Sequence, residues 1–350
     1  MATKHLSLLF VFITTFLDII REKGVTMCTT ISHGSYAGRN LDVDKDYNEE
    51  IIITPREYIF NFKRASSISS HYAMIGMGVM ADGYPLYFDA ANERGLYAAG
   101  LNYLGNAKYQ SLADRKTVLA PYELIPYLLS KCATVKEAEY ELEGISLTDI
   151  PFRADMPVAE LHFLIADRGS SIVVEPDADG LKVYKNPVGV LSNNPPFPMQ
   201  LFSLNNYMNL TSEPAENRFS KALDLKRYSF GMGAIGLPGD LSSTSRFVRA
   251  AFHKANAIKR NDLADILHLL SSVSMPEGSV RLGCGYERTE YTSAIDLSRL
   301  IYSYRTYESP CTYAVKMSSE DISGKALIHY ALKREKEPFI VNSPNQGFTV

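Results

Sequence analysis

Short apolar runs, many of them alternating with polar positions, begin near residue 28 and recur through the first half of the chain. Alternation with a period of two is typical of β-strands that bury one face. Turn pairs at Asp82-Gly83 and Asp179-Gly180 separate neighbouring runs. The pattern predicts strands over residues 29–31, 36–41, 51–54, 72–80, 86–90, 96–101, 162–167, 171–176, 181–185 and 189–191.

Helical periodicity interrupts these strands in two places. Pro121 suits a first helical turn, and Thr134 with Glu137 forms a capping box. Helices are predicted over residues 121–131, 135–143, 243–258 and 262–273, and strands resume over 291–296, 300–306 and 311–317. Strands, helices and strands in this order predict an α+β fold in which helices cover antiparallel sheets.

The composition is that of an ordinary globular protein. The chain has 350 residues, of which 46% are hydrophobic and 21% charged, and its formal net charge is -3. Because this charge provides no basic surface, we expect no nucleic-acid partner. The four cysteines, Cys28, Cys132, Cys284 and Cys311, match no metal-ligand spacing and no disulfide framework. No metal or cofactor is expected.

The first 27 residues do not resemble a domain. The apolar run over residues 6–17 follows Lys4 like a signal peptide, but Met27 is not the small residue that cleavage requires. The run is also too short to span a bilayer. Residues 23–26 can be encoded by a purine-rich bacterial ribosome-binding sequence. We therefore predict that residues 1–27 are an untranslated or removed leader, that 28–350 form one domain, and that the protein is cytoplasmic with no membrane partner.

Cys28 would then be the first residue of the mature chain and would carry a thiol and a free α-amine. A thiol needs a base to become a nucleophile, and an α-amine with a pKa near 7.7 to 8.0 can act as that base. The alternative is that Cys28 is a small, inert core residue.

Two charged residues, Arg39 and Asp42, follow Cys28 by eleven and fourteen positions, on a strand that a hairpin can place beside it. A guanidinium near the sulfur favours thiolate, and a carboxylate near the amine orients it. The alternative is a surface ion pair.

Further polar residues lie at strand ends and on one helix. Asn102 and Asn193 could donate to an oxyanion or could be turn residues. Arg246 and Arg249 share a helix face and could bind an anion or be solvated. The scattered histidines His71, His162, His253, His268 and His329 are interpreted as structural.

Five blocks taken together resemble the choloylglycine hydrolase family in order and spacing. They are residues 27–29, 38–42, 92–102, 189–195 and 236–247. The resemblance implies an N-terminal-nucleophile hydrolase with a four-layer αββα sandwich, in a family that contains bile salt hydrolases and penicillin V acylases and commonly forms homotetramers.

The resemblance also implies roles for single residues. It makes Cys28 the nucleophile and, through its amine, the base, with Arg39 and Asp42 as partners. The main chain of Asn102 and the side chain of Asn193 would form the oxyanion hole, and Arg246 would complete the site.

The implied substrate is a conjugated bile salt. Penicillin V acylases usually have tyrosine where this chain has Asn102, and residues 84–86 and 99–102 also resemble bile salt hydrolases. The residues matching the sterol pocket are Leu41, Ala81, Phe152 and Met156. They do not separate glycine from taurine conjugates. Penicillin V or N-acyl homoserine lactone acylase activity is an alternative, as is a non-catalytic sterol-binding protein if the leader stays attached.

Overall fold

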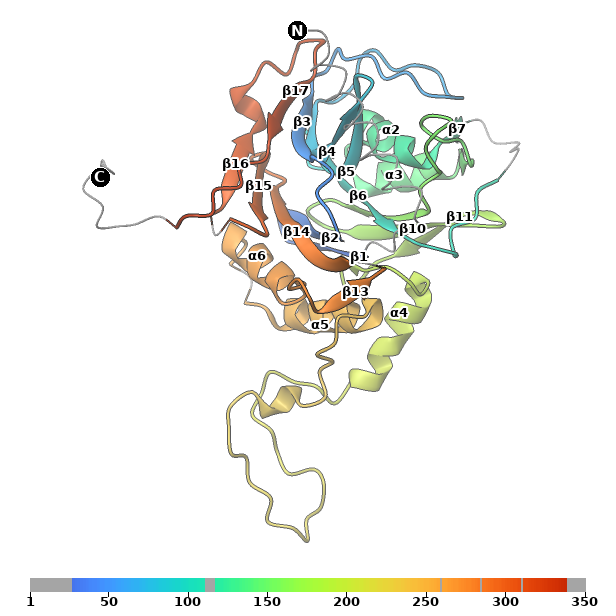
Figure 1. The fold of residues 1–350 in the computed structure, drawn as a ribbon. Helices are drawn as coiled ribbons and strands as arrows, with labels where there is room; N and C mark the ends of the chain where they lie inside the picture. Colours follow the sequence, from blue (N-terminus) through green and yellow to red (C-terminus); the bar gives the residue numbers. More distant parts are fainter. Residues whose placement is uncertain (1–26, 111–116, 259, 284, 310, 339–350) are drawn as a thin grey trace, which may run out of the picture.

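Two antiparallel β-sheets form the centre of the fold (Figure 1). The computed structural model describes residues 27–110, 117–258, 260–283, 285–309 and 311–338. Within these ranges the first sheet has seven strands, in the order β12 (Val190–Leu191), β1 (Met27–His33), β2 (Tyr36–Val43), β14 (Gly285–Asp296), β15 (Ile301–Thr306) and β16 (Tyr313–Lys316), with β13 (Val280–Leu282) paired to β14.

The second sheet has eight strands in the described part of the chain. Their order is β11 (Gly180–Lys185), β10 (Ser171–Asp177), β9 (Leu161–Ala166), β6 (Tyr97–Asn102), β5 (Tyr84–Asn92), β4 (Met74–Ala81), β3 (Glu50–Thr54) and β17 (Ile328–Ala331). A short parallel pair, β7 (Thr117–Leu119) and β8 (Ile145–Leu147), lies apart from both sheets.

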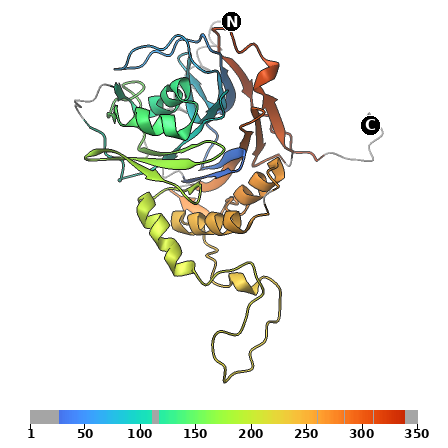
Figure 2. The same ribbon diagram turned by 180° about the vertical axis from the view of Figure 1, so that it is seen from behind.

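Helices cover the outer faces of the two sheets, as Figures 1 and 2 show. On the second sheet, α2 (Leu124–Lys131) packs against β5 and β6, and α3 (Val135–Leu142) packs against β9. On the first sheet, α5 (Ser243–Asn256) and α6 (Leu263–Ser271) pack against β1. The predicted α+β sandwich with αββα layers is therefore confirmed.

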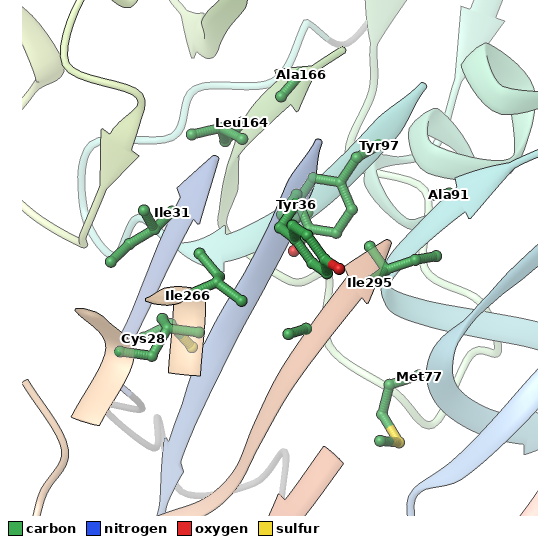
Figure 3. Close-up of a cluster of buried hydrophobic side chains, with 14 of the residues drawn as sticks. Cys28, Ile31, Tyr36, Met77, Ala91, Tyr97, Leu164, Ala166, Ile266 and Ile295 are labelled. Carbon is green, nitrogen blue, oxygen red and sulfur yellow. The ribbon is translucent and has the colours of Figure 1, made fainter. Parts of the chain in front are cut away.

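Apolar side chains from both sheets join in one buried cluster, part of which is drawn in Figure 3. It includes Cys28 and Ile31 from β1, Leu164 from β9 and Ile266 from α6. A second cluster lies between the second sheet and α2 and α3. The first cluster surrounds Cys28 with apolar groups on the described strands and helices.

Most predicted elements are present, and the differences are local. The Thr134 hydroxyl caps α3 by accepting from the Glu137 N–H at 3.2 Å, but the Glu137 carboxylate accepts from Ala133 rather than Thr134. The sequence pattern missed α4 (Phe197–Ser203), which begins directly after Pro195 and Pro196. It missed β17 because a four-residue edge strand carries too few alternating positions.

Residues 208–241 leave the body of the fold between α4 and α5, and we call them the projecting segment. Figures 1 and 2 show this segment extending away from both sheets. Its large apolar side chains are exposed, including Met208, Phe219, Tyr228 and Phe230. The short helices η2 (Leu204–Tyr207) and η3 (Met232–Ala234) lie at its start and within it.

Among the helices that the structure describes, none combines the length and the apolar character needed to cross a membrane. The predicted leader, apart from Met27, lies outside the described residues.

Candidate active site

The hairpin of β1 and β2 places Cys28, Arg39 and Asp42 together. Its register pairs Cys28 with Leu41, Thr30 with Arg39 and Met27 with Asp42. Side chains alternate between the faces of a sheet, so Cys28 and Arg39 share one face and Asp42 takes the other. The turn uses Gly34 at φ +59, where an added Cβ would lie 2.5 Å from the Asn261 side chain. The tight turn therefore fixes which polar groups meet Cys28.

The Arg39 guanidinium holds the sulfur of Cys28. Its Nη2 lies 2.7 Å from Cys28 Sγ, and its Nη1 donates to the carbonyl oxygens of Phe88 and Gly100, each at 2.9 Å. Both side chains are buried. Burial raises the pKa of the Cys28 thiol, and the charge of Arg39 opposes that shift. The guanidinium favours thiolate, as the sequence predicts. In the chain that still carries Met27, however, burial raises the pKa of the thiol more than the charge of Arg39 lowers it.

Asp42 lies on the other face of β2, toward α5. Its Oδ1 accepts a hydrogen bond of 2.6 Å from the Thr289 hydroxyl, and its Oδ2 lies 3.7 Å from Arg246 Nη1. Burial raises the pKa of Asp42 to about 6, against the opposing effects of Arg246, Thr289 and Arg39. Asp42 is a fully buried carboxylate held by a hydroxyl and a guanidinium, and not half of a surface ion pair.

The two asparagines predicted at strand ends meet beside Cys28. Asn102 ends β6 and Asn193 follows β12. Asn193 Nδ2 donates to the Asn102 carbonyl oxygen at 2.9 Å, and Asn193 Oδ1 accepts from the Cys28 main-chain nitrogen at 2.8 Å. The amide of Asn193 thus bridges the first residue of the predicted domain and the end of a strand in the opposite sheet.

Arg246, on α5, joins these groups from the helical layer. Its Nη1 donates to the Cys28 carbonyl oxygen at 2.6 Å and to the Thr29 hydroxyl at 2.5 Å, and its Nη2 donates to Asn193 Oδ1 at 2.8 Å. Arg249 instead donates to the carbonyl oxygens of Ser272, Pro238 and Asp240. Of the two arginines, only Arg246 contacts the Cys28 main chain in the structure.

The four predicted pocket residues do not share one cluster. Leu41 belongs to the cluster around Cys28. Phe152 packs against the second cluster, with its ring 5.9 Å from that of Tyr84, in a cavity of about 490 Å³ that Asp82 also lines. Ala81 is half-buried at the end of β4, and Met156 is buried.

Several groups around the site were missed by sequence reasoning. Glu287 accepts from the Met27 main-chain nitrogen at 3.0 Å, and Ser243 Oγ accepts from the Asn193 main-chain nitrogen at 2.9 Å. Gln200 on α4 donates to the carbonyl oxygens of Asn193 and Pro195, the latter at 2.7 Å. No spacing in the sequence links these residues to Cys28, because the fold brings them from distant segments.

Two antiparallel sheets between two helical layers form the αββα fold of the N-terminal-nucleophile hydrolases. Residues 25–330 match the linear amide C–N hydrolases of the choloylglycine hydrolase family, and this chain belongs to that family.

Curated relatives cover nearly the whole chain. A bile salt hydrolase/transferase of Lactiplantibacillus plantarum is 43% identical over 324 residues, which are 90% of this chain and 100% of the relative. A bile salt hydrolase/transferase of Clostridium perfringens is 34% identical over 301 residues, and the alignment covers 84% of this chain and 92% of the relative.

Solved structures share the fold. A mutant of the conjugated bile acid hydrolase from Clostridium perfringens matches with a TM-score of 0.84 at 32% identity, over 90% of this chain and 100% of its own. Penicillin V acylase from Agrobacterium tumefaciens matches with a TM-score of 0.67 at 23% identity, over 88% of this chain and 92% of its own. At this identity the acylase shows the fold alone.

Proposed function

We propose that this protein is a bile salt hydrolase, which cleaves the amide bond between a bile acid and glycine or taurine with Cys28 as nucleophile. The observation that carries the proposal is the contact of Asn193 with the nitrogen of Cys28, beside a sulfur held by Arg39. Asn193 thus contacts the nitrogen that would act as the base, and Arg39 contacts the sulfur that would act as the nucleophile.

The reaction begins once residue 27 has been removed. The free α-amine of Cys28 takes the thiol proton, and the thiolate attacks the amide carbon. The resulting oxyanion accepts hydrogen bonds from the second N–H of Asn193 Nδ2 and from the main chain of Asn102. The ammonium then protonates the leaving nitrogen as the carbon–nitrogen bond breaks, and glycine or taurine departs while the bile acid remains as a thioester.

Water completes the cycle. The α-amine accepts a proton from water as its oxygen attacks the thioester carbon, and the same two asparagines bind the second oxyanion. The carbon–sulfur bond breaks, the sulfur recovers its proton from the ammonium, and the free bile acid leaves. Arg39 stabilises the thiolate in both halves of the reaction. Arg246 holds the Cys28 main chain in place, and Asp42 lies beside the Arg246 guanidinium.

The substrate assignment is supported by the relatives, whose names describe bile salt and conjugated bile acid hydrolases over most of the chain. By family resemblance we assign Leu41, Ala81, Phe152 and Met156 to the wall that receives the sterol, although of these four only Leu41 belongs to the buried cluster around Cys28. Leu41 pairs with Cys28 in the hairpin, which places it beside the reacting sulfur.

The leader, the assembly and the location complete the proposal. Residues 1–27 are removed or never translated, and Cys28 begins a single domain over 28–350. The protein forms a homotetramer, which is supported by the exposed apolar side chains of the projecting segment, such as Phe230 at 92% exposure. From the sequence alone we place it in the cytoplasm, so its substrate must be imported.

The test is hydrolysis by the purified protein. Intact mass first establishes that Cys28 is the N-terminal residue, and released glycine and taurine are then measured with glycocholate and taurocholate. We expect turnover with the bile salts and less with penicillin V, and none with Cys28→Ala. Mature protein that releases neither amino acid contradicts the proposal, and faster cleavage of penicillin V would make it an acylase of the alternative kind.

A further inference from the structure

A buried histidine, which the proposed reaction does not use, lies behind the two asparagines. His162 is on β9 and is fully buried. The register of β6 and β9 pairs it with Leu101, the residue before Asn102. Its ring nitrogens contact Ser192, the residue before Asn193, and Glu175 on β10.

The contact with Ser192 fixes one proton on the ring. His162 Nε2 lies 2.8 Å from the Ser192 carbonyl oxygen. A carbonyl oxygen only accepts, so Nε2 must donate. Ser192 directly precedes Asn193, whose side chain bridges Cys28 and Asn102. The imidazole therefore holds the main chain from which Asn193 projects.

Glu175 fixes the other edge of the ring. His162 Nδ1 lies 3.2 Å from Glu175 Oε1, which also accepts from the Phe197 N–H at 2.8 Å at the start of α4. The two contacts of Glu175 Oε1 therefore tie the Nδ1 edge of the ring to the start of α4. Both partners are buried, so the pair is held at a fixed orientation.

The face of the ring contacts the other asparagine's strand. The rings of His162 and Tyr103 stack with centroids 4.5 Å apart and planes 7° apart. Tyr103 directly follows Asn102 and donates its main-chain N–H to the Glu160 carbonyl oxygen at 2.8 Å. His162 thus touches the chain neighbour of each asparagine, one through an edge and the other through a face.

We infer that His162 is a positioning residue for the oxyanion hole, which sets the spacing between Asn193 Nδ2 and the main chain of Asn102. The inference rests on the proposed function, because that function makes this pair bind the two oxyanions. An error of about 1 Å in the placement of such groups costs about 100-fold in rate. The bound substrate, in contrast, is held chiefly by its sterol, so KM should change little.

The test compares two substitutions at one position. His162→Phe keeps a flat ring against Tyr103 and removes the donor to Ser192, whereas His162→Gln keeps an N–H near the position of Nε2. We expect kcat to fall about 100-fold in the phenylalanine variant, with KM within threefold of the wild type. The kcat of the glutamine variant should be at least tenfold higher than that of the phenylalanine variant.

His71→Phe is the matched control. Its imidazole is also buried and contacts two main-chain carbonyl oxygens, those of Tyr72 and Tyr58, at 2.8 and 2.9 Å. None of these residues adjoins Asn102 or Asn193. We expect this control to lower the melting temperature and to leave kcat within threefold of the wild type.

The outcomes separate the inference from the proposed function. Wild-type protein that cleaves neither glycocholate nor penicillin V contradicts the function. An active wild type whose His162→Phe variant keeps its kcat, while losing stability as His71→Phe does, overturns the positioning role. If His162→Phe does not fold, Glu175→Gln is the second variant. It puts an amide in place of the carboxyl group that contacts His162 Nδ1 and the Phe197 N–H, and it should lower kcat about tenfold. An unchanged kcat in this variant also overturns the positioning role.

Discussion

Asn193 Oδ1 lies 2.8 Å from the main-chain nitrogen of Cys28. The same oxygen accepts from Arg246, and Asn193 Nδ2 donates to the Asn102 carbonyl oxygen. These partners fix the orientation of the amide. If it were flipped, its NH2 group would face the N–H donors of Cys28 and Arg246, and its oxygen would face the Asn102 carbonyl oxygen. One side chain therefore contacts the proposed base through its oxygen and presents its remaining N–H to an oxyanion.

Substitution of Asn193 by aspartate separates the role of the side-chain oxygen from that of the N–H donor. Asn193→Asp keeps an acceptor for Cys28 and Arg246 but removes the N–H donor. We expect kcat for glycocholate to fall by about 100- to 1,000-fold, as for other lost oxyanion donors. Asn186→Asp is a control at another buried asparagine, whose Nδ2 donates to Val190. An Asn193→Asp enzyme with more than a third of the wild-type kcat would show that the donor lies elsewhere.

The reactivity of the Cys28 sulfur should depend on Arg39. Burial raises the pKa of the thiol, and the guanidinium opposes this rise, so Arg39→Met should raise the pKa further. Because only the thiolate reacts, alkylation by iodoacetamide at pH 7 should slow at least about tenfold. The rate is measured on the Cys28 peptide by mass spectrometry, with Arg39→Lys as the variant that retains the charge. Equal rates in Arg39→Met and wild type would contradict the assignment.

The hairpin part of the site could be predicted from the sequence, because it depends on local rules. Alternation and a glycine turn bring Arg39 beside Cys28 within a few residues of chain. Strand ends also indicated Asn102 and Asn193 as candidates. Their selection required the family resemblance, since the contact between them spans 91 residues.

The remaining contacts could not be predicted from spacing. Met27 and Glu287 are 260 residues apart, and the pairing of β14 with β2 brings them together. Gln200 lies on α4, whose proline-rich start hid the helix from the pattern. No motif surrounds His162 in the sequence, so the sequence alone indicates a structural histidine. Its neighbours Ser192 and Tyr103 are defined only when the ends of β12 and β6 meet in space.

The projecting segment should determine the assembly state. Phe219 and Phe230 are 84% and 92% exposed in this segment, which a single chain cannot cover. We expect the wild type to have several times the mass of one mature chain in light scattering after size exclusion. The double variant Phe219→Ser and Phe230→Ser should have a lower mass. Tyr140→Ser, at 77% exposure on α3, is the control. A wild type of single-chain mass would contradict the proposed tetramer.

The buried carboxyl group of Glu287 has an unusual environment. Its Oε1 accepts from Met27, and its Oε2 has no hydrogen-bond partner among the residues that the structure describes. Burial raises the pKa of Glu287 to about 8, the charges of Asp42 and Asp44 add to the rise, and the Met27 N–H and Arg246 oppose it. In the unfolded chain the same group ionises near pH 4.3.

Glu287→Gln should therefore stabilise the fold in a pH-dependent way. Between about pH 4.5 and 8 the folded protein binds a proton that the unfolded chain has lost, so wild-type stability falls as pH rises through this window. Glutamine carries no such proton, and at about 1.4 kcal/mol per pKa unit its advantage should grow to at least about 2 kcal/mol at pH 8. The free energy of unfolding is measured in urea at pH 5, 6.5 and 8, with a tag ahead of Met27 to retain that residue. The exposed Glu216→Gln should stay within about 0.5 kcal/mol of the wild type throughout, and a Glu287→Gln advantage that does not grow with pH would show that this carboxyl group is ionised in the fold.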